Sequence, residues 1–213
     1  MPQSCSAGGA AYPVCDRLSG NPVFFRVKDF NLAADGTIDV KKAGWGVFKT
    51  PTEGRPEGAL NANLSYSYGF GTGNSYTLGG GYGGFGGGWN ASNGNSYGSP
   101  YAPFLSGSPS GLNNLNNVND VTGPGAAVVF ASGAATVAGT VNANGTQPEC
   151  SGSSGGSIWI AAKTLSVSPS ATLTATTTKL NSTYKGGGGG RISLAENVTD
   201  AEIAALAAST GRP

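Results

Sequence analysis

Histidine is absent from this chain, and charged residues are few and lie mostly near its two ends. They make up 11% of the 213 residues, the net charge is +1, and only Asp120 and Glu149 are charged between Gly58 and Ala162. Nucleophilic triads usually need histidine as their base, and metal sites use it as their commonest ligand. A nearly neutral chain without a basic patch also lacks the electrostatic footprint of a nucleic-acid binder. We therefore expect no cofactor, no metal site and no nucleic-acid partner.

Cysteine is nearly absent too, with three residues and no CxxC spacing of the kind that zinc or thioredoxin-like sites use. Cys5 and Cys15 are placed to close a small loop through a disulfide, which would leave Cys150 unpaired. The alternative, in which the thiols are free or only partly paired, stays open. Both readings leave the cysteines as structural residues rather than as a reactive motif.

The chain has no long apolar run, since none approaches the about 20 residues that span a bilayer. We expect no membrane span. Its first residues lack the basic and apolar regions of a secretory signal, which would count against export if the chain were complete. The abundance of Asn, Ser, Thr and Gly is nevertheless typical of exported proteins. We expect an extracellular or cell-surface location and a chain that is a fragment of a longer one.

Glycine, in contrast, supplies 37 residues. Because glycine loses the most backbone entropy on ordering, such a chain folds only with a heavily hydrogen-bonded or closely stacked backbone. This favours a sheet-based architecture over a helical bundle. Gly79, Gly81 and Gly84 match the dinucleotide-binding spacing, but the strand and helix that should flank that motif are missing. We assign this match to composition.

A first short pattern recurs three times and reads small-Thr-apolar-polar-apolar, which is typical of a strand with one buried face. It occupies residues 36–40, 139–143 and 171–175. If like strands stack on like strands, one apolar side chain of each copy lies in a continuous inward column. The members of this expected column are Ile38, Val141 and Leu173.

A second pattern, an apolar tetrapeptide that follows a glycine, recurs in the same order. Its copies start at Val128, Ile158 and Ile192, and Phe25 begins a plausible fourth copy. The recurrence of two strand types in one order favours a repeating stack over a sandwich or a barrel. The expected second inward column consists of Phe130, Ile160 and Leu194.

These patterns predict an all-β fold, a right-handed parallel β-helix (β-solenoid), with its handedness following the rule for parallel crossovers. It would occupy residues 25–199, with a Gly/aromatic-rich insertion at about 44–125. A Cys-containing segment, 1–24, precedes it, and a short helix and tail, 200–213, follows.

The C-terminal segment carries a helix start signal. Thr199 and Glu202 have the spacing of a capping box, and Ile203 and Leu206 share one helical face. We expect a helix from about Asp200 to residue 208 that covers the open end of the solenoid.

Several motifs, taken in order, resemble those of Gly-rich parallel β-helix modules in very large bacterial surface proteins of planctomycete and verrucomicrobium type. They are the turn at 35–38, the Gly-aromatic block at 79–88, the turn at 141–145, Gly-Gly-Ser-Ile-Trp-Ile at 155–160 and poly-Gly-Arg-Ile at 186–192. The resemblance covers roughly 25–195 and departs at 41–58, which is charged and interrupted by proline. It implies a structural or adhesive cell-surface protein and carries over no catalytic residue.

The aromatic residues of the insertion are the candidate ligand contacts. Flat rings beside glycine are accessible, and Tyr and Trp dominate interface hot spots. Alternatively, the rings pack within the fold, or the segment is disordered low-complexity chain. We expect a non-enzymatic structural or adhesive module with polysaccharide or other surface proteins as partners. The candidates are Tyr82, Phe85, Trp89, Tyr97 and Tyr101.

Two other functions stay open. The first is a carbohydrate-active β-helix enzyme, a lyase or glycoside hydrolase, that uses Asp35 and Asp39; an even offset puts both on one face of a strand. The same carboxylates also fit ordinary solvated surface charge. The second is a fibre subunit that self-assembles through open β-helix ends and the Gly/Tyr tract.

Overall fold

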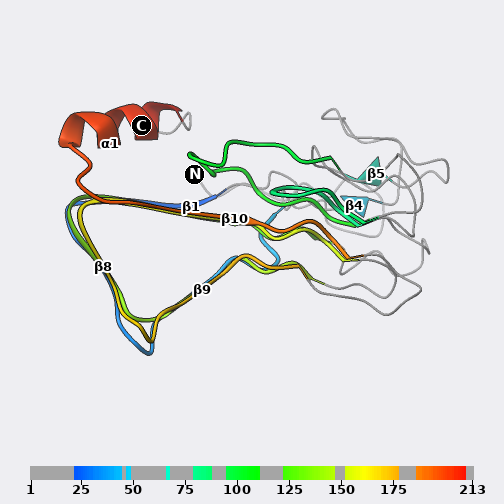
Figure 1. The fold of residues 1–213 in the computed structure, drawn as a ribbon, viewed down its shortest axis with the longest axis horizontal. Helices are drawn as coiled ribbons and strands as arrows, with labels where there is room; N and C mark the ends of the chain where they lie inside the picture. The colour runs from blue at the N-terminus through cyan, green and yellow to red at the C-terminus, as the bar shows by residue number, and fades with distance from the viewer. Residues whose placement is uncertain are drawn as a thin grey trace, which may run out of the picture.

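The computed structural model describes residues 22–44, 47–48, 66–67, 79–87, 95–110, 122–146, 152–177 and 186–209 (Figure 1). The candidate residues Cys5, Cys15 and Trp89 lie outside this part of the chain. The elements are β1 (Val23–Val27), β2 (Phe30–Leu32), β3 (Thr37–Asp39), β4 (Val47–Phe48), β5 (Tyr66–Ser67), β6 (Ala126–Val137), β7 (Thr140–Asn142), β8 (Ser157–Val167), β9 (Thr172–Thr174), β10 (Arg191–Ala195) and α1 (Asp200–Ser209).

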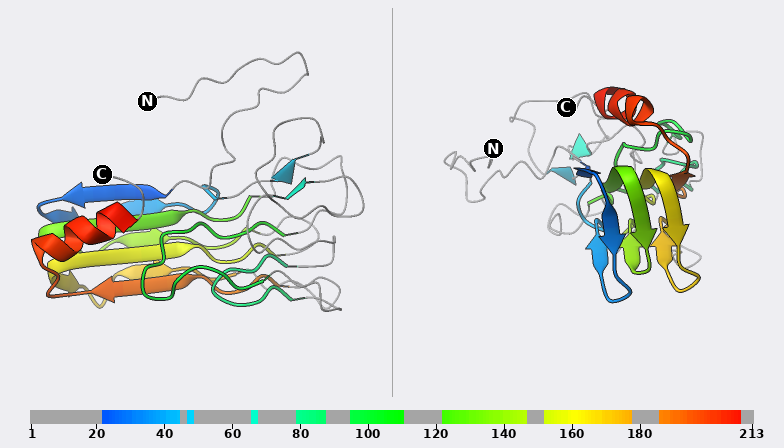
Figure 2. Two further views of the ribbon diagram at one scale, coloured as in Figure 1. Left: turned by 90° about the horizontal axis from the view of Figure 1, so that it is seen from above. Right: turned by 90° about the vertical axis from the view of Figure 1, so that its left-hand side faces the viewer.

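The largest sheet contains five parallel strands in the order β1-β6-β8-β10, with β2 paired to the second half of β6. A second parallel sheet has the order β3-β7-β9, and β4 and β5 form an antiparallel pair. Figure 2 shows the strands of the parallel sheets side by side. The expected column of Ile38, Val141 and Leu173 is confirmed by the register of β3, β7 and β9.

The second expected column is shifted by one residue. Val129, and not Phe130, lies beside Ile160, which in turn lies beside Leu194. Phe130 is paired with Ala161 instead. The tetrapeptide of β6 therefore starts one residue earlier than its sequence indicates.

A core fills the space between the two parallel sheets. Its members include Val129, Ile160 and Val141, each at most 2% exposed. Burying one such aliphatic side chain contributes about 1.5–3 kcal/mol. This core holds the two sheets together.

The opposite face of the five-stranded sheet carries a second core. Phe130 is fully buried there, and its ring meets those of Phe24 and Trp159 edge to face, at 5.3 and 4.7 Å. Ile203 and Ala207 of α1 pack on the same cluster. Because successive residues of a strand point to opposite faces, burial on both faces explains the uninterrupted apolar runs of β6 and β8.

The helix forms where the capping box predicts it, at Asp200–Ser209. The Thr199 hydroxyl donates to Glu202 Oε2 at 2.7 Å, and the Thr199 N–H donates to the same oxygen at 2.8 Å. The hydroxyl bond first, and the N–H bond second, lower the pKa of the Glu202 carboxyl. The expected position of the helix is wrong, because α1 contacts β6 and β8 and covers a sheet face rather than an end.

The fold-class prediction, an all-β right-handed parallel β-helix, is wrong. The described strands fall into two parallel sheets and an antiparallel pair, and a helix covers one sheet face, which gives a mixed α/β arrangement. The physical reason for this difference is that large apolar side chains lie on both faces of the five-stranded sheet. Phe130 and Trp159 face away from the inter-sheet core, and this second apolar face requires a cover, part of which is α1.

Candidate functional site

Five extended segments without strand pairing lie together beyond the ends of the strands. We name them the glycine bundle: residues 79–87, 106–110, 123–125, 152–156 and 186–190. Backbone hydrogen bonds join them, for example Gly83 N–H to Gly189 O at 2.8 Å and Gly155 N–H to Gly188 O at 2.9 Å. The bundle is therefore held by its main chain, as the glycine content requires.

Close approach of backbones explains why these residues are glycine. A Cβ atom at Gly188 would lie 2.0 Å from Gly84 O, and one at Gly155 would lie 2.1 Å from Ala175 O. Among the described glycines only Gly98 has a positive φ, of 74°. Glycine serves here to bring main chains together, as at the crowded axis of collagen, rather than to make left-handed turns.

Two buried serines add side-chain hydrogen bonds to the bundle. The Ser153 hydroxyl donates to Thr146 O at 2.8 Å and accepts from the Thr146 N–H at 2.6 Å. The Ser154 hydroxyl accepts from the Ser108 N–H at 2.8 Å. These hydroxyls link neighbouring segments, and a buried serine within the bundle is a structural group.

Tyr82 lies inside the structure, and Tyr97 is half-buried against it. Tyr82 is 0% exposed and its hydroxyl is hydrogen-bonded to Ser157 Oγ at 2.5 Å. The Tyr97 hydroxyl donates to Ser106 O at 2.5 Å, and the two ring centroids are 4.8 Å apart. Burial raises the pKa of both phenols.

Arg191 binds this tyrosine pair from the start of β10. Its guanidinium carbon lies 5.4 Å from the centre of the Tyr82 ring, and its Nη2 donates to Tyr97 O at 3.0 Å. Local sequence gives no reason to select Arg191 or Ser157, although the Gly-Arg-Ile and Gly-Ser-Ile motifs contain them. Their role is to fix the two tyrosines on the sheet.

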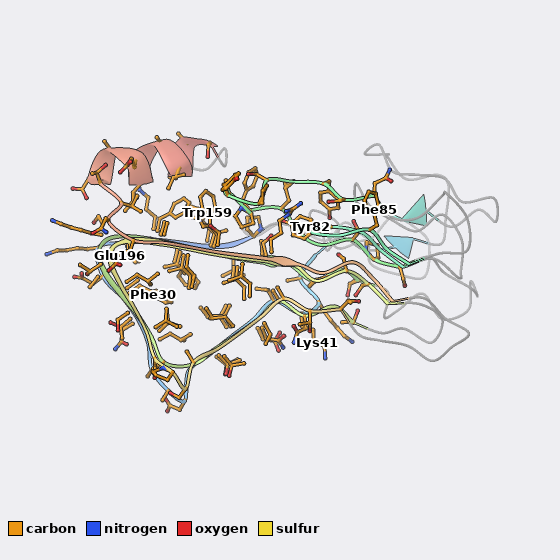
Figure 3. All side chains as sticks on the ribbon, viewed as in Figure 1. Phe30, Lys41, Tyr82, Phe85, Trp159 and Glu196 are labelled. Atoms are coloured by element: carbon orange, nitrogen blue, oxygen red, sulfur yellow. The ribbon has the colours of Figure 1, made fainter. Side chains whose placement is uncertain are left out.

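Phe85 and Tyr101 are the exposed rings of this region, with 69% and 85% of their surface accessible. The backbone at Tyr101 is anchored, because its carbonyl accepts from the Ser193 hydroxyl at 3.2 Å. Phe85 lies beside Gly188, where an added Cβ would be 3.2 Å from the Phe85 carbonyl carbon. Figure 3 shows Phe85 in the layer above the five-stranded sheet, with Tyr82 beneath that layer.

Main-chain contacts place the backbones of Phe85 and Tyr101 against one stretch of chain, the one that enters β10. The residues that they contact, Gly188 and Ser193, are five positions apart on it. The surrounding polar residues Asn95, Ser96 and Ser99 are exposed. Residues 79–87 and 95–110 contain no charged side chain. The site combines two exposed aromatic rings, several amide and hydroxyl groups and one cation, Arg191, whose Nη2 lies 3.5 Å from Ser96 Oγ.

The carboxylates of the alternative enzymatic site are both exposed. Asp35 lies in the turn before β3 and Asp39 at the end of β3, so the strand-alternation argument that grouped them does not apply. Asp39 Oδ1 accepts the Lys41 N–H at 2.9 Å. Within the described ranges, no three His, Cys, Asp or Glu residues gather as a metal site would require.

Among the described residues no helix is long and apolar enough to cross a membrane. No family model, curated protein or solved structure matches the chain.

Proposed function

We propose that this chain is a non-enzymatic structural or adhesive module that contacts neutral polysaccharide through Phe85 and Tyr101. The observation that carries the proposal is the contrast between the four described aromatic candidates. Tyr82 is buried, Tyr97 is half-buried and both are hydrogen-bonded, whereas Phe85 and Tyr101 are exposed on segments whose backbones are fixed.

The chemistry of this surface supports a sugar ligand. An apolar ring face stacks on the C–H face of a sugar, and neighbouring amides and hydroxyls exchange hydrogen bonds with its hydroxyl groups. Ser99, whose Oγ accepts the Tyr101 N–H at 3.2 Å, supplies such a group beside Tyr101, and Asn95 and Ser96 are exposed on the same segment. Residues 79–87 and 95–110 carry no charge, and the Arg191 guanidinium beside them is engaged by Tyr97 O and the Tyr82 ring, which favours a neutral polymer over an acidic one.

A rigid support favours binding because it leaves little conformational entropy to lose. The backbone of the Phe85 segment is bonded to residues 186–190, and that of Tyr101 is bonded to Ser193. The backbones that carry the two rings are therefore held in place without a ligand, and this favours a module that binds through a rigid surface.

The test is retention of the protein by neutral polysaccharides in affinity electrophoresis. Each of Phe85→Ala and Tyr101→Ala removes an exposed ring, and we expect a loss of about 1–2 kcal/mol, or roughly 5- to 30-fold in affinity. Val167→Ala is the matched control, because Val167 is an exposed apolar residue elsewhere, on β8. Unchanged retention in the double variant would exclude the two rings as the contact.

A further inference from the structure

The five-stranded sheet extends one strand further than the second sheet at one end of the molecule. β3, β7 and β9 pair in the same order as β1, β6 and β8, so three successive strands of one sheet match three of the other. β10 continues the first sheet from β8, whereas none of the described strands pairs with the free edge of β9. Figure 2 shows β10, in orange, at the outer side of the strands. β10 is therefore a free edge strand without a strand of the second sheet beside it.

The inward side chains of β10 are exposed at this edge. Ile192 lies beside Ile158, a member of the core between the two sheets. Leu194 lies in the same way beside Ile160. Both residues of β10 are 44% exposed, whereas their two core neighbours are at most 1% exposed. The β10 edge thus presents apolar side chains together with main-chain groups that have no partner strand.

Charged residues protect the other outer strand of this sheet but not β10. Arg26 on β1 is exposed, as are Lys28 and Asp29 directly after that strand. Charge on an edge strand is a common means of preventing its pairing with another chain. The single charged residue of β10, Arg191, is half-buried, and its Nη2 donates to Tyr97 O at 3.0 Å. β10 therefore lacks the protection that β1 has.

We propose that β10 pairs with β10 of a second copy of this chain in an antiparallel sense, about a two-fold axis perpendicular to the sheet. The contact is isologous, because each copy offers the same strand. The two five-stranded sheets then form one continuous sheet whose inward faces lie on the same side. Because β10 extends beyond β9, the second sheets of the two copies stay apart and do not prevent the two edges from meeting.

The apolar residues of β10 are self-complementary in this pairing. With Ser193 on the axis, Ile192 lies opposite Leu194 of the second copy, and Leu194 lies opposite its Ile192. Apolar side chains in directly opposite positions of an antiparallel pair are in contact and stabilise it. Each inward column of the sheet, that of Ile158 and that of Ile160, therefore continues into the other column of the second copy.

The same pairing suits the charge and the main chain of β10. Arg191 lies opposite Ala195 of the second copy, so no like charges stand directly opposite each other, which would destabilise the pair. The N–H and C=O groups on the free side of each strand gain partners, which supply the affinity in strand addition. The free edges of the joined sheet are then the two β1 strands, beside which the exposed charges lie. A second copy is the occupant because it covers the unprotected edge of this sheet and leaves the protected one free.

The experiment is sedimentation velocity on the full chain between about 1 and 100 μM, because the weaker specific interfaces dissociate in the micromolar range. Leu194→Lys places a charge on the β10 edge. Val23→Lys is the matched control, because Val23 is an exposed apolar residue of the same inward face on the other outer strand, β1. Circular dichroism establishes that each variant is folded. If Leu194→Lys unfolds the chain, the double variant Ile192→Thr with Leu194→Thr takes its place.

We expect the wild type and Val23→Lys to be monomers in equilibrium with dimers and to form nothing larger. In Leu194→Lys the Kd of the dimer should rise about 100-fold or more, since the charge enters the contact twice. A wild type that stays monomeric, or a Leu194→Lys variant that dimerises as the wild type does, would overturn the proposal. So would a growing series of species or the loss of dimers in Val23→Lys, because either result would place the β1 edge in the contact.

Discussion

At the residue scale, Gly188 and Gly189 are chain neighbours with different surroundings. A Cβ at Gly188 would lie 2.0 Å from a carbonyl oxygen, whereas one at Gly189 would meet nothing within 4 Å. We expect Gly188→Ala to lower the free energy of unfolding by about 1–3 kcal/mol or more through overpacking. Gly189→Ala should leave it unchanged or raise it by up to about 1 kcal/mol. Urea denaturation measures both, and equal effects would contradict backbone stacking as the reason for glycine.

The buried tyrosines predict a loss of stability at alkaline pH. A folded-state pKa above the ordinary value of about 10 means that the unfolded chain loses its phenolic protons first. The contribution of these two phenols to the free energy of unfolding is therefore complete below pH about 10 and is lost as pH rises above it. The loss is about 1.4 kcal/mol per pH unit for each phenol that stays protonated in the folded state. Denaturation between pH 8 and 11 should show this slope.

The matched variant is Tyr82→Phe with Tyr97→Phe, which removes both buried phenols and keeps both rings. We expect a shallower alkaline slope in this double variant. A slope equal to that of the wild type would show that other groups cause the loss. Below pH 9 the variant should be less stable by about 1–3 kcal/mol, because two hydrogen-bonding hydroxyls are gone.

At this scale the sequence identifies the aromatic candidates, but it does not separate the buried rings from the exposed ones. Tyr82 and Tyr101 both stand in Gly- and Ser-rich sequence. What separates them is contact with distant residues, since the Tyr82 hydroxyl meets Ser157, 75 positions away. Local sequence does not contain that information, and so exposure could not be assigned from it.

At the scale of elements, α1 and the strands of the two recurring patterns were predictable because each has a local signal, whereas the short strands β2, β4 and β5 were not predicted. Alternating apolar residues mark β3, β7 and β9, and the Thr199–Glu202 pair marks the start of the helix. The one-residue shift in register that pairs Phe130 with Ala161 was not predictable. A strand buried on both faces has no alternation of apolar and polar residues to fix which side chains point inward.

The packing of α1 gives a prediction at the same scale. Ile203 is 3% exposed and belongs to the cluster of Phe130 and Trp159. We expect Ile203→Ala to lower the free energy of unfolding by about 2–4 kcal/mol, the usual result of a cavity in a core. Ala204→Lys, at an exposed position of the same helix, is the control and should change little. Equal stability of wild type and Ile203→Ala would mean that α1 is not part of the cooperative fold.

At the scale of the whole molecule, repeats indicated parallel stacking but did not fix the architecture. Short strands at even spacing are compatible with several sheet arrangements, and the cover over Phe130 and Trp159 depends on contacts between distant segments. The proposed function at this scale depends on a surface feature, the two exposed rings of Phe85 and Tyr101.

The most direct test of the central claim, a non-enzymatic module that contacts neutral polysaccharide, is a polysaccharide panel scored both for retention of the protein and for release of sugar ends. The account predicts retention on neutral polymers without new sugar ends. Release of sugar ends would contradict it and would return attention to Asp35 and Asp39. If no polymer retains the protein and no sugar ends are released, the proposed contact with polysaccharide is itself contradicted.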